Sequence, residues 1–195
     1  MKHTFQPARL ALALALLWAL GLTAYAQADA SSLNLDKTGS ISLTLTAGDG
    51  SAVTGGEISL YQVASLYLDG GDMAYTLTED FQDCTAVLDV EDTSLAATLA
   101  AYAAQQSIPG TAAAVETDGS VRFDGLELGL YLVAQTVGSD HYETISPFVV
   151  TLPMDSGGAW VYAEDASPKV GTITASSSPE PEEPTPSEPT LPQTG

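Results

Sequence analysis

Basic residues, histidine and cysteine are scarce in this chain of 195 residues, and each scarcity excludes a class of function. Five lysines and arginines stand against 25 acidic residues, for a formal charge of −20. Lys2 and Arg9 lie at the very start, whereas every acidic residue follows position 28. Because this acidic remainder repels nucleic acid and anionic lipid, we expect no nucleic-acid partner.

The single cysteine, Cys84, excludes an intrachain disulfide framework. With no basic residue or histidine near it in the sequence, we expect a buried apolar side chain; disulfide-linked dimerisation is the alternative. The two histidines are His3 and His141. One cysteine and two histidines support neither a zinc site nor a Cys-His nucleophile. Ser139 lies close to His141, and we interpret this pair as a solvated polar loop.

Acidic residues are abundant, but their number alone indicates no metal site. Residues 69–72 read Asp-Gly-Gly-Asp and resemble a calcium loop only faintly, because further oxygen ligands at alternating positions are missing. A hairpin turn is the better interpretation. We expect no cofactor, no metal and no enzymatic activity.

The first 28 residues have the three-part layout of a secretory signal peptide. A short cationic start precedes an unbroken apolar run at residues 10–22, and two small-x-small cleavage sequences end at Ala26 and Ala28. An uncleaved membrane anchor is the alternative, but a membrane span needs about 20 apolar residues. We expect cleavage after residue 26 or 28.

Residues 29–170 are long enough for one domain, and their pattern is mainly strand. Ile41, Leu43 and Leu45 alternate with serine and threonine, which is typical of a strand with one buried face. Glycine-containing turns separate the further strands that we expect. Their ranges are 57–64, 73–77, 121–123, 129–137, 145–152 and 159–163. This number and spacing of short strands favours a β-sandwich.

One segment, residues 92–106, has a helical pattern instead. It is rich in alanine and leucine, and four of its residues fall on one helical face: Leu95, Leu99, Tyr102 and Ala103. Thr93 or Ser94 is the expected cap, and Pro109 ends the run. We expect this inserted helix to cover a sheet edge or one end of the core.

The C-terminal end carries the most specific pattern. Residues 176–190 contain only serine, proline, glutamate and threonine, which predicts a disordered stalk over residues 171–190. The chain then ends with Leu191, Pro192, Gln193, Thr194 and Gly195. This L-P-x-T-G sequence resembles the sorting signal that sortases cleave in Gram-positive bacteria. Such signals are normally followed by a hydrophobic segment and basic residues, which the printed sequence does not contain.

Two stretches of the domain resemble the N-terminal domain of Gram-positive backbone pilins. They are Gly-Leu-Glu-Leu-Gly-Leu-Tyr-Leu-Val at residues 125–133 and Ser-Pro-Phe-Val-Val-Thr-Leu-Pro at residues 146–153. The resemblance covers about residues 40–169. It implies an immunoglobulin-like sandwich of the collagen-adhesin B type, here with one inserted helix.

The resemblance extends to a motif that carries chemistry in those pilins. Trp160, Tyr162, Pro168 and Lys169 match its register, but Glu164 and Ala166 stand where valines are usual, and Ser167 replaces a tyrosine. In the family, the lysine amine attacks a sortase-bound subunit and forms an intermolecular isopeptide bond. The resemblance therefore implies Lys169 as the nucleophile. An ordinary solubilising lysine is the alternative.

Many related domains also form an internal isopeptide bond, and Lys37 lies where its lysine would be. The family's glutamate position is occupied by Gln135, which has no carboxyl proton, and Asn34 is too close to Lys37 in sequence to lie across the sheet. We expect no internal isopeptide bond.

Together these patterns predict a secreted protein anchored to the cell wall of a Gram-positive bacterium. We expect a sortase substrate that is a pilus subunit; the alternative is a monomeric wall-anchored adhesin. The implied partners are the sortase, peptidoglycan, other pilin subunits and a host-surface ligand.

Overall fold

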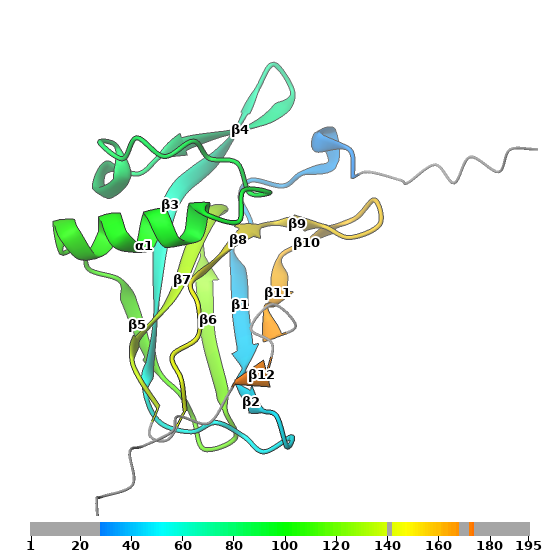
Figure 1. Ribbon diagram of the computed structural model, residues 1–195. Helices are drawn as coiled ribbons and strands as arrows, with labels where there is room; N and C mark the ends of the chain where they lie inside the picture. Colours follow the sequence, from blue (N-terminus) through cyan, green and yellow to red (C-terminus); the bar gives the residue numbers. More distant parts are fainter. Residues whose placement is uncertain (1–27, 140–141, 168–171, 174–195) are drawn as a thin grey trace, which may run out of the picture.

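The computed structural model describes residues 28–139, 142–167 and 172–173. Two β-sheets pack face to face, and one helix covers the outer side of the larger sheet (Figure 1). The helical elements are η1 (Ala30–Ser32), η2 (Glu79–Phe81) and α1 (Leu95–Gln106). The strands are β1 (Gly39–Thr44), β2 (Thr46–Ala47), β3 (Glu57–Asp69), β4 (Asp72–Leu77), β5 (Thr111–Ala114), β6 (Ser120–Leu126), β7 (Gly129–Val137), β8 (Phe148–Leu152), β9 (Met154–Asp155), β10 (Trp160–Val161), β11 (Ala163–Asp165) and β12 (Thr172–Ile173). The predicted mainly-β, immunoglobulin-like sandwich with one inserted helix is confirmed.

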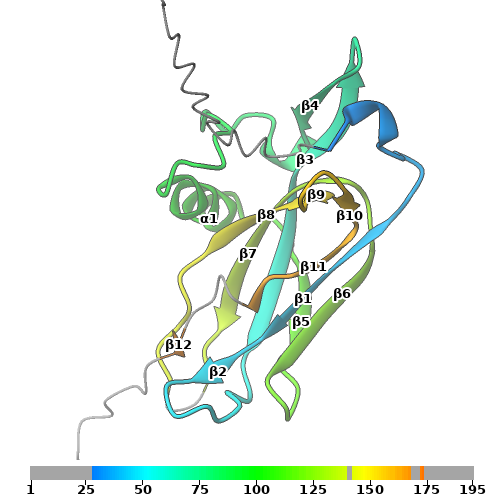
Figure 2. The ribbon, with the colours of Figure 1, turned by 90° about the vertical axis from the view of Figure 1, so that its right-hand side faces the viewer.

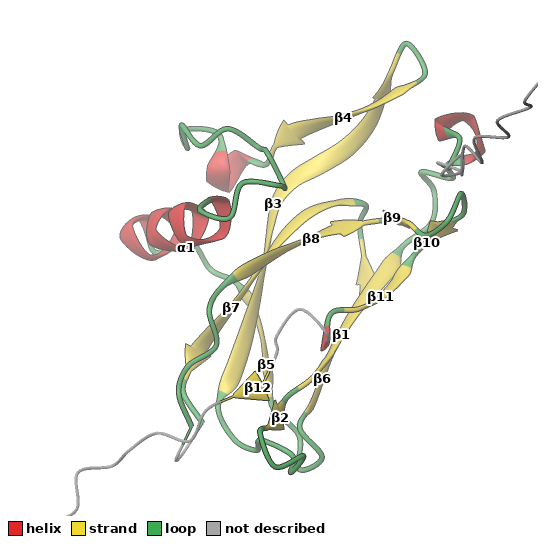
Figure 3. Cartoon of the chain, turned by 45° about the vertical axis from the view of Figure 1, so that its right-hand side comes forward, coloured by secondary structure: helices red, strands yellow, loops and turns green. Residues whose placement is uncertain are grey.

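The smaller sheet has the order β11-β1-β6 (Figure 3). β1 pairs antiparallel with β6, so that Ile41 lies opposite Phe123, and parallel with β11. Successive side chains of a strand point to opposite faces. Ile41 and Leu43 are accordingly fully buried between the sheets, while Arg122 on the neighbouring strand is exposed. The predicted alternation is confirmed for this strand.

The larger sheet is built on β3, which has 13 residues and is longer than predicted. Its first half pairs with β5 and its second half with β4, while β7 pairs along the other edge and β8 follows β7. Gly70 and Gly71 form the turn between β3 and β4 with φ angles of 61° and 102°. Only glycine adopts such angles readily, so the predicted hairpin turn is confirmed.

β7 lies between two hydrophobic clusters and contributes side chains to both. Tyr131 and Val133 pack into the core between the two sheets, whereas Leu130 and Leu132 pack against the helix side. A strand that is buried on both faces reads as a continuous apolar run instead of an alternating one. This double burial explains the run of buried residues at 129–133.

The helix position differs from the prediction. α1 packs over β7 and β8 on the outer face of the larger sheet, not at a sheet edge or at one end of the core (Figure 2). Its buried face consists of Leu95, Ala96, Leu99 and Ala103. The sequence pattern identified the apolar stripe but not its partner, because a helical stripe fits a sheet face as well as an edge.

The helix starts after one of the two predicted cap residues, but the expected capping hydrogen bond is missing. Ser94 occupies the N-cap position, but its side chain makes no capping hydrogen bond. Instead, the backbone N–H and the hydroxyl of Ser94 both donate to Asp92 Oδ1, each at 2.8 Å. The helix begins at Leu95, directly after Ser94, and Asp92 forms the turn that precedes it.

The two ends of the predicted domain organisation lie partly outside the described residues. The signal peptide and the sorting sequence stay predictions. β12, which falls within the predicted stalk, pairs in parallel with β2, with Thr172 opposite Thr46. No helix in the described ranges is both long enough and apolar enough to span a membrane.

Candidate functional site

Trp160 and Tyr162, the two described residues of the pilin-like motif, lie at one end of the sandwich. Trp160 opens β10, which pairs with β9 so that Trp160 lies opposite Asp155. Tyr162 separates β10 from β11. Both side chains are half-buried and pack against the core between the sheets.

The two aromatic side chains hold the segment that precedes β1. We call residues 28–38 the N-terminal strap. Trp160 Nε1–H donates to the backbone oxygen of Asp29 at 3.0 Å, and the hydroxyl of Tyr162 accepts from the backbone N–H of Asn34, also at 3.0 Å. Buried or half-buried tryptophan and tyrosine normally find a partner for their polar atom. Here the partner is the backbone of the strap in both cases.

Two further contacts fasten the strap. Lys37 Nζ lies 4.7 Å from the centroid of the Tyr162 ring, which is cation–π geometry. The backbone N–H of Ala28 donates to Asp155 Oδ2 at 2.9 Å. These four contacts, which we call the clasp, were not predicted from the sequence. A segment that does not pair in a sheet leaves no periodic pattern of apolar residues in the sequence.

The backbone of Tyr162 approaches β1 closely. Its carbonyl oxygen accepts from Ser40 N–H at 2.8 Å. A Cβ atom placed on Gly39 would lie 2.6 Å from the same oxygen, closer than any side chain tolerates. Gly39 is therefore needed for the approach of the motif segment to the first strand.

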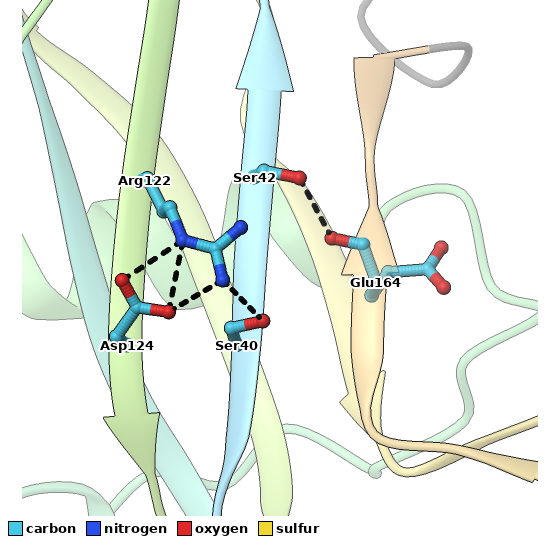
Figure 4. Close-up of polar contacts among 5 residues, drawn as sticks. All are labelled: Ser40, Ser42, Arg122, Asp124 and Glu164. Atoms are coloured by element: carbon cyan, nitrogen blue, oxygen red, sulfur yellow. Dashed lines mark hydrogen bonds and ion pairs between the residues drawn. The ribbon is translucent and has the colours of Figure 1, made fainter.

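β11 then runs beside β1 in the same direction. Ala166 N–H donates to the Ser42 carbonyl at 2.8 Å, and the Ser42 hydroxyl donates to the Glu164 carbonyl at 3.3 Å (Figure 4). Ala166, at one of the two valine positions of the family motif, is fully buried. Glu164, at the other, is only half-buried, and this position at the sheet edge accommodates a carboxylate.

The outer face of the same sheet carries an ion pair. Arg122 Nη2 lies 2.7 Å from Asp124 Oδ1 and donates to the Ser40 hydroxyl at 3.4 Å (Figure 4). Both charged side chains are more than half exposed, at 59% and 63%. Solvent screens exposed pairs, so this pair neutralises charge more than it stabilises the sheet.

Pro168 and Lys169 lie outside the described residues, but their described neighbours are attached to the first strands. The Ser167 hydroxyl accepts from Thr44 N–H at 2.7 Å. On the other side, Thr172 pairs with Thr46. The Ser167 hydroxyl and backbone N–H also bond to Asp165, which lowers the pKa of that carboxyl.

Two of the residues considered for an internal isopeptide bond, Lys37 and Gln135, lie near opposite ends of β7, whereas Asn34 and Lys37 are neighbours in the strap. Lys37 lines a cavity of about 270 Å³ with Ser65 and Leu128, at one end of β3 and β7. Gln135 lies at the other end of β7, where its Oε1 accepts from Ile145 N–H at 2.9 Å. Asn34 Oδ1 accepts from Asp36 N–H at 3.0 Å, within the strap.

Ser139 differs from the prediction. Instead of lying in a solvated loop, it is buried, and its hydroxyl donates to the Gly55 carbonyl at 2.7 Å while accepting from Gln135 Nε2 at 3.3 Å. The hydroxyl ties two loops together at the end of the sandwich. His141 lies outside the described residues. The predicted burial of Cys84 is confirmed.

Metal ligands do not gather in the described part of the chain. There, no group of three or more histidine, cysteine, aspartate or glutamate residues has metal-binding geometry. Several acidic side chains instead stabilise turns by accepting hydrogen bonds. Asp49, Asp92 and Asp118 each accept hydrogen bonds from the backbone and hydroxyl of a serine two residues later, which lowers the pKa of each carboxyl.

No protein-family model and no curated protein matches this chain. Among solved structures, it is similar to the full-length major pilin SpaD of Corynebacterium diphtheriae, with 23% identity, a TM-score of 0.48, and coverage of 74% of this chain and 32% of SpaD. The fimbrial protein FimP of Actinomyces oris matches with 21% identity, a TM-score of 0.45 and coverage of 69% and 30%. The T6 backbone pilin of serotype M6 Streptococcus pyogenes matches with 16% identity, a TM-score of 0.44 and coverage of 73% and 28%.

The chain spans about a third of the length of these three pilins. The identities and TM-scores are too low to assign it to a family, and they transfer no residue roles.

Proposed function

We propose that this chain is a secreted, wall-anchored protein that a sortase assembles into a pilus. The sortase would recognise residues 191–195, and Lys169 would be the acceptor amine of the polymer. The chain itself would be a substrate and not an enzyme. Its partners would be the sortase, peptidoglycan and further copies of a pilin subunit on the cell surface.

One observation carries the role of Lys169. Ser167 and Thr172, the nearest described residues on either side of it, are both bound to the segment formed by β1 and β2. An acceptor lysine whose flanking residues are fixed would lose less entropy when it meets an enzyme-bound acyl group.

The proposed reaction has two steps. The sortase cysteine thiolate attacks the Thr194 carbonyl, the Thr194–Gly195 amide breaks, and a thioester forms while a general acid of the sortase protonates the Gly195 nitrogen, which leaves as an amine. The neutral amine of Lys169 on another subunit then attacks the thioester, an isopeptide bond forms, and the thiolate is released. Because the ordinary pKa of a lysine amine is about 10.4, the sortase has to supply the base that takes its proton.

The test is a pair of substitutions at Lys169 in a strain that expresses the matching sortase. Wild-type surface extracts should show a ladder of covalent multimers that survives boiling in detergent and reductant. Lys169→Ala should collapse this ladder to monomer. Lys169→Arg should do the same, because a guanidinium stays protonated and cannot attack. Thr194→Ala should abolish both the ladder and wall attachment.

Lys37→Ala is the matched control, since it removes the only other lysine that follows residue 28. Its ladder should equal that of wild type. A ladder that persists in Lys169→Ala, or that disappears in Lys37→Ala instead, would contradict the assignment of the nucleophile. A wild-type protein that forms no ladder but is attached to the wall would instead be the monomeric adhesin.

A further inference from the structure

The two ends of the sandwich hold opposite ends of the described chain. At one end, which we call the base, the Ser167 hydroxyl accepts from Thr44 N–H at 2.7 Å, and β12 pairs with β2. The other end carries the β3–β4 hairpin and the N-terminal strap, which the clasp holds (Figure 1). The described chain therefore starts at the strap end and finishes at the base.

Both linking positions of the proposed polymer reach the domain at this base. Lys169 comes two residues after Ser167 and three residues before Thr172, and two or three residues of chain span at most about 7–11 Å. β1, which separates the base from the strap, has six residues and spans about 20 Å. Thr194 is joined to the domain through the predicted stalk, which begins at residue 171. The link that enters a subunit and the stalk that leaves it therefore meet at the same end of the sandwich.

We infer, as an extension that rests on the proposed function, that the covalent backbone of the polymer consists of residues 169–194 of successive subunits. Each domain is attached to this backbone at its base alone. A subunit is joined to one neighbour through Lys169 and to the other through its own stalk, so the residues before Lys169 form a side group. The base of one domain is thus connected to the base of the next, and the strap end stays unconnected in every subunit.

The competing arrangement is an end-to-end stack, in which the strap end of one domain packs on the base of the next. Such packing would bring exposed carboxylates together from both ends, and like charges repel. Lys37 is the one lysine among the described residues that could offset them. The carboxylates are Asp49, Glu116 and Asp118 at the base, and Asp29, Asp36 and Asp155 at the strap end. Charge therefore favours domains that hang separately from the backbone.

Cutting the assembled polymer at two places tests the covalent path. A recognition sequence for a site-specific protease fits between Gly70 and Gly71 in the β3–β4 turn, where a Cβ atom added to either glycine meets nothing within 4 Å. After cleavage there, a denaturing gel should still show the ladder, with every rung lighter because residues 29–70, about a quarter of residues 29–195, are released. The same sequence inserted between Ser178 and Pro179 should collapse the ladder to monomer on cleavage. The uncut insertion proteins are the controls and should form the ladder of the wild type.

The length of the stalk tests whether the domains hang separately or stack. Duplication of residues 179–188 lengthens the stalk, and a proline-rich segment extends by about 3.1 Å per residue. In a purified covalent dimer, small-angle X-ray scattering should show the distance between the two domain centres increase by up to about 30 Å. An insertion of equal length between Gly70 and Gly71 is the matched control and should leave this distance unchanged.

Two results would overturn the inference while the protein still forms a polymer. Collapse of the ladder after cleavage in the β3–β4 turn would place the acceptor amine before residue 70, as at Lys37. A distance between domain centres that does not respond to the stalk duplication would show that the domains stack. A wild-type protein that forms no ladder at all would instead refute the proposed function, and the inference with it.

Discussion

The two hydrophobic clusters of this domain share β3 and β7 but are built differently. The cluster between the sheets, which we call the sandwich core, has a sheet on each side, and the strands of both sheets are hydrogen-bonded to their neighbours. The cluster beneath the helix, the helix layer, is closed by α1 and η2, which have no sheet pairing to hold them. The first can adjust only if hydrogen-bonded ladders move, whereas the second can adjust by a shift of one helix.

This difference indicates where the removal of a buried side chain should lower the stability most. A cavity is expensive when the surrounding structure cannot collapse into it. We therefore expect equal substitutions to destabilise the sandwich core more than the helix layer, although the side chains are equally buried. Three substitutions test this comparison.

The largest effect is expected for Leu43→Ala in the sandwich core. Leu43 is 1% exposed, and β1 is held by β6 on one side and β11 on the other. The free energy of unfolding should fall by about 3–5 kcal/mol, as measured by urea unfolding followed by circular dichroism. Leu35→Ala, at a leucine that is 41% exposed, is the control and should cost much less. A similar cost for both leucines would contradict the rigidity of this core.

A smaller effect is expected for Leu99→Ala in the helix layer. Leu99 is fully buried beneath α1, but the helix can move toward β7 and fill part of the cavity. We expect a loss of about 2–3 kcal/mol. Hydrogen exchange should increase mainly in α1, with β1 and β6 still protected. Gln105→Ala on the exposed face of the same helix should change little, and uniform loss of protection in Leu99→Ala would show that the two clusters unfold as one.

The smallest effect is expected at the end of the helix. Ser107 has a φ of 54°, the one residue other than glycine with a positive φ in the described part of the chain. A left-handed conformation is strained for residues with a Cβ atom. Ser107→Gly should therefore stabilise the protein by about 0.5–1 kcal/mol, seen as a higher urea midpoint. Ser107→Ala keeps the strain and should bring no gain.

The fold was predictable where a single physical constraint acts on each residue. Ile41 and Leu43 alternate with serines because one face of β1 meets the core, while the other carries the polar contacts of Ser40 with Arg122 and of Ser42 with Glu164. The run at residues 129–133 was recognisable as a strand, but the helix that causes its second buried face was assigned to the wrong place. Ser94 shows a similar limit. Its hydroxyl can accept a capping hydrogen bond from the helix backbone or donate one to Asp92, and the sequence does not show which of the two forms.

The site was predictable only in part. Trp160 and Tyr162 were identified from a motif, yet their partners on the strap were not, because a backbone oxygen or N–H carries no signature in the sequence. Ser139 was taken for a solvated residue because its neighbours are polar, whereas its hydroxyl is buried against the Gly55 carbonyl. Contacts between segments more than 80 residues apart depend on the completed fold.

The parallel pairing of β1 and β11 also has a mechanical consequence. A pull on the chain beyond Asp165, against a hold on the chain before Gly39, acts at opposite ends of two strands that run in the same direction. Such a pull is directed along the strands and loads their hydrogen bonds together, as in shear. The hairpin β3–β4 would instead open one bond at a time if its two ends were pulled apart. If the chain is anchored through residues 191–195, as proposed, β11 is paired with β1 in the direction that resists tension best, and single-molecule pulling from the C-terminal side should give a high rupture force.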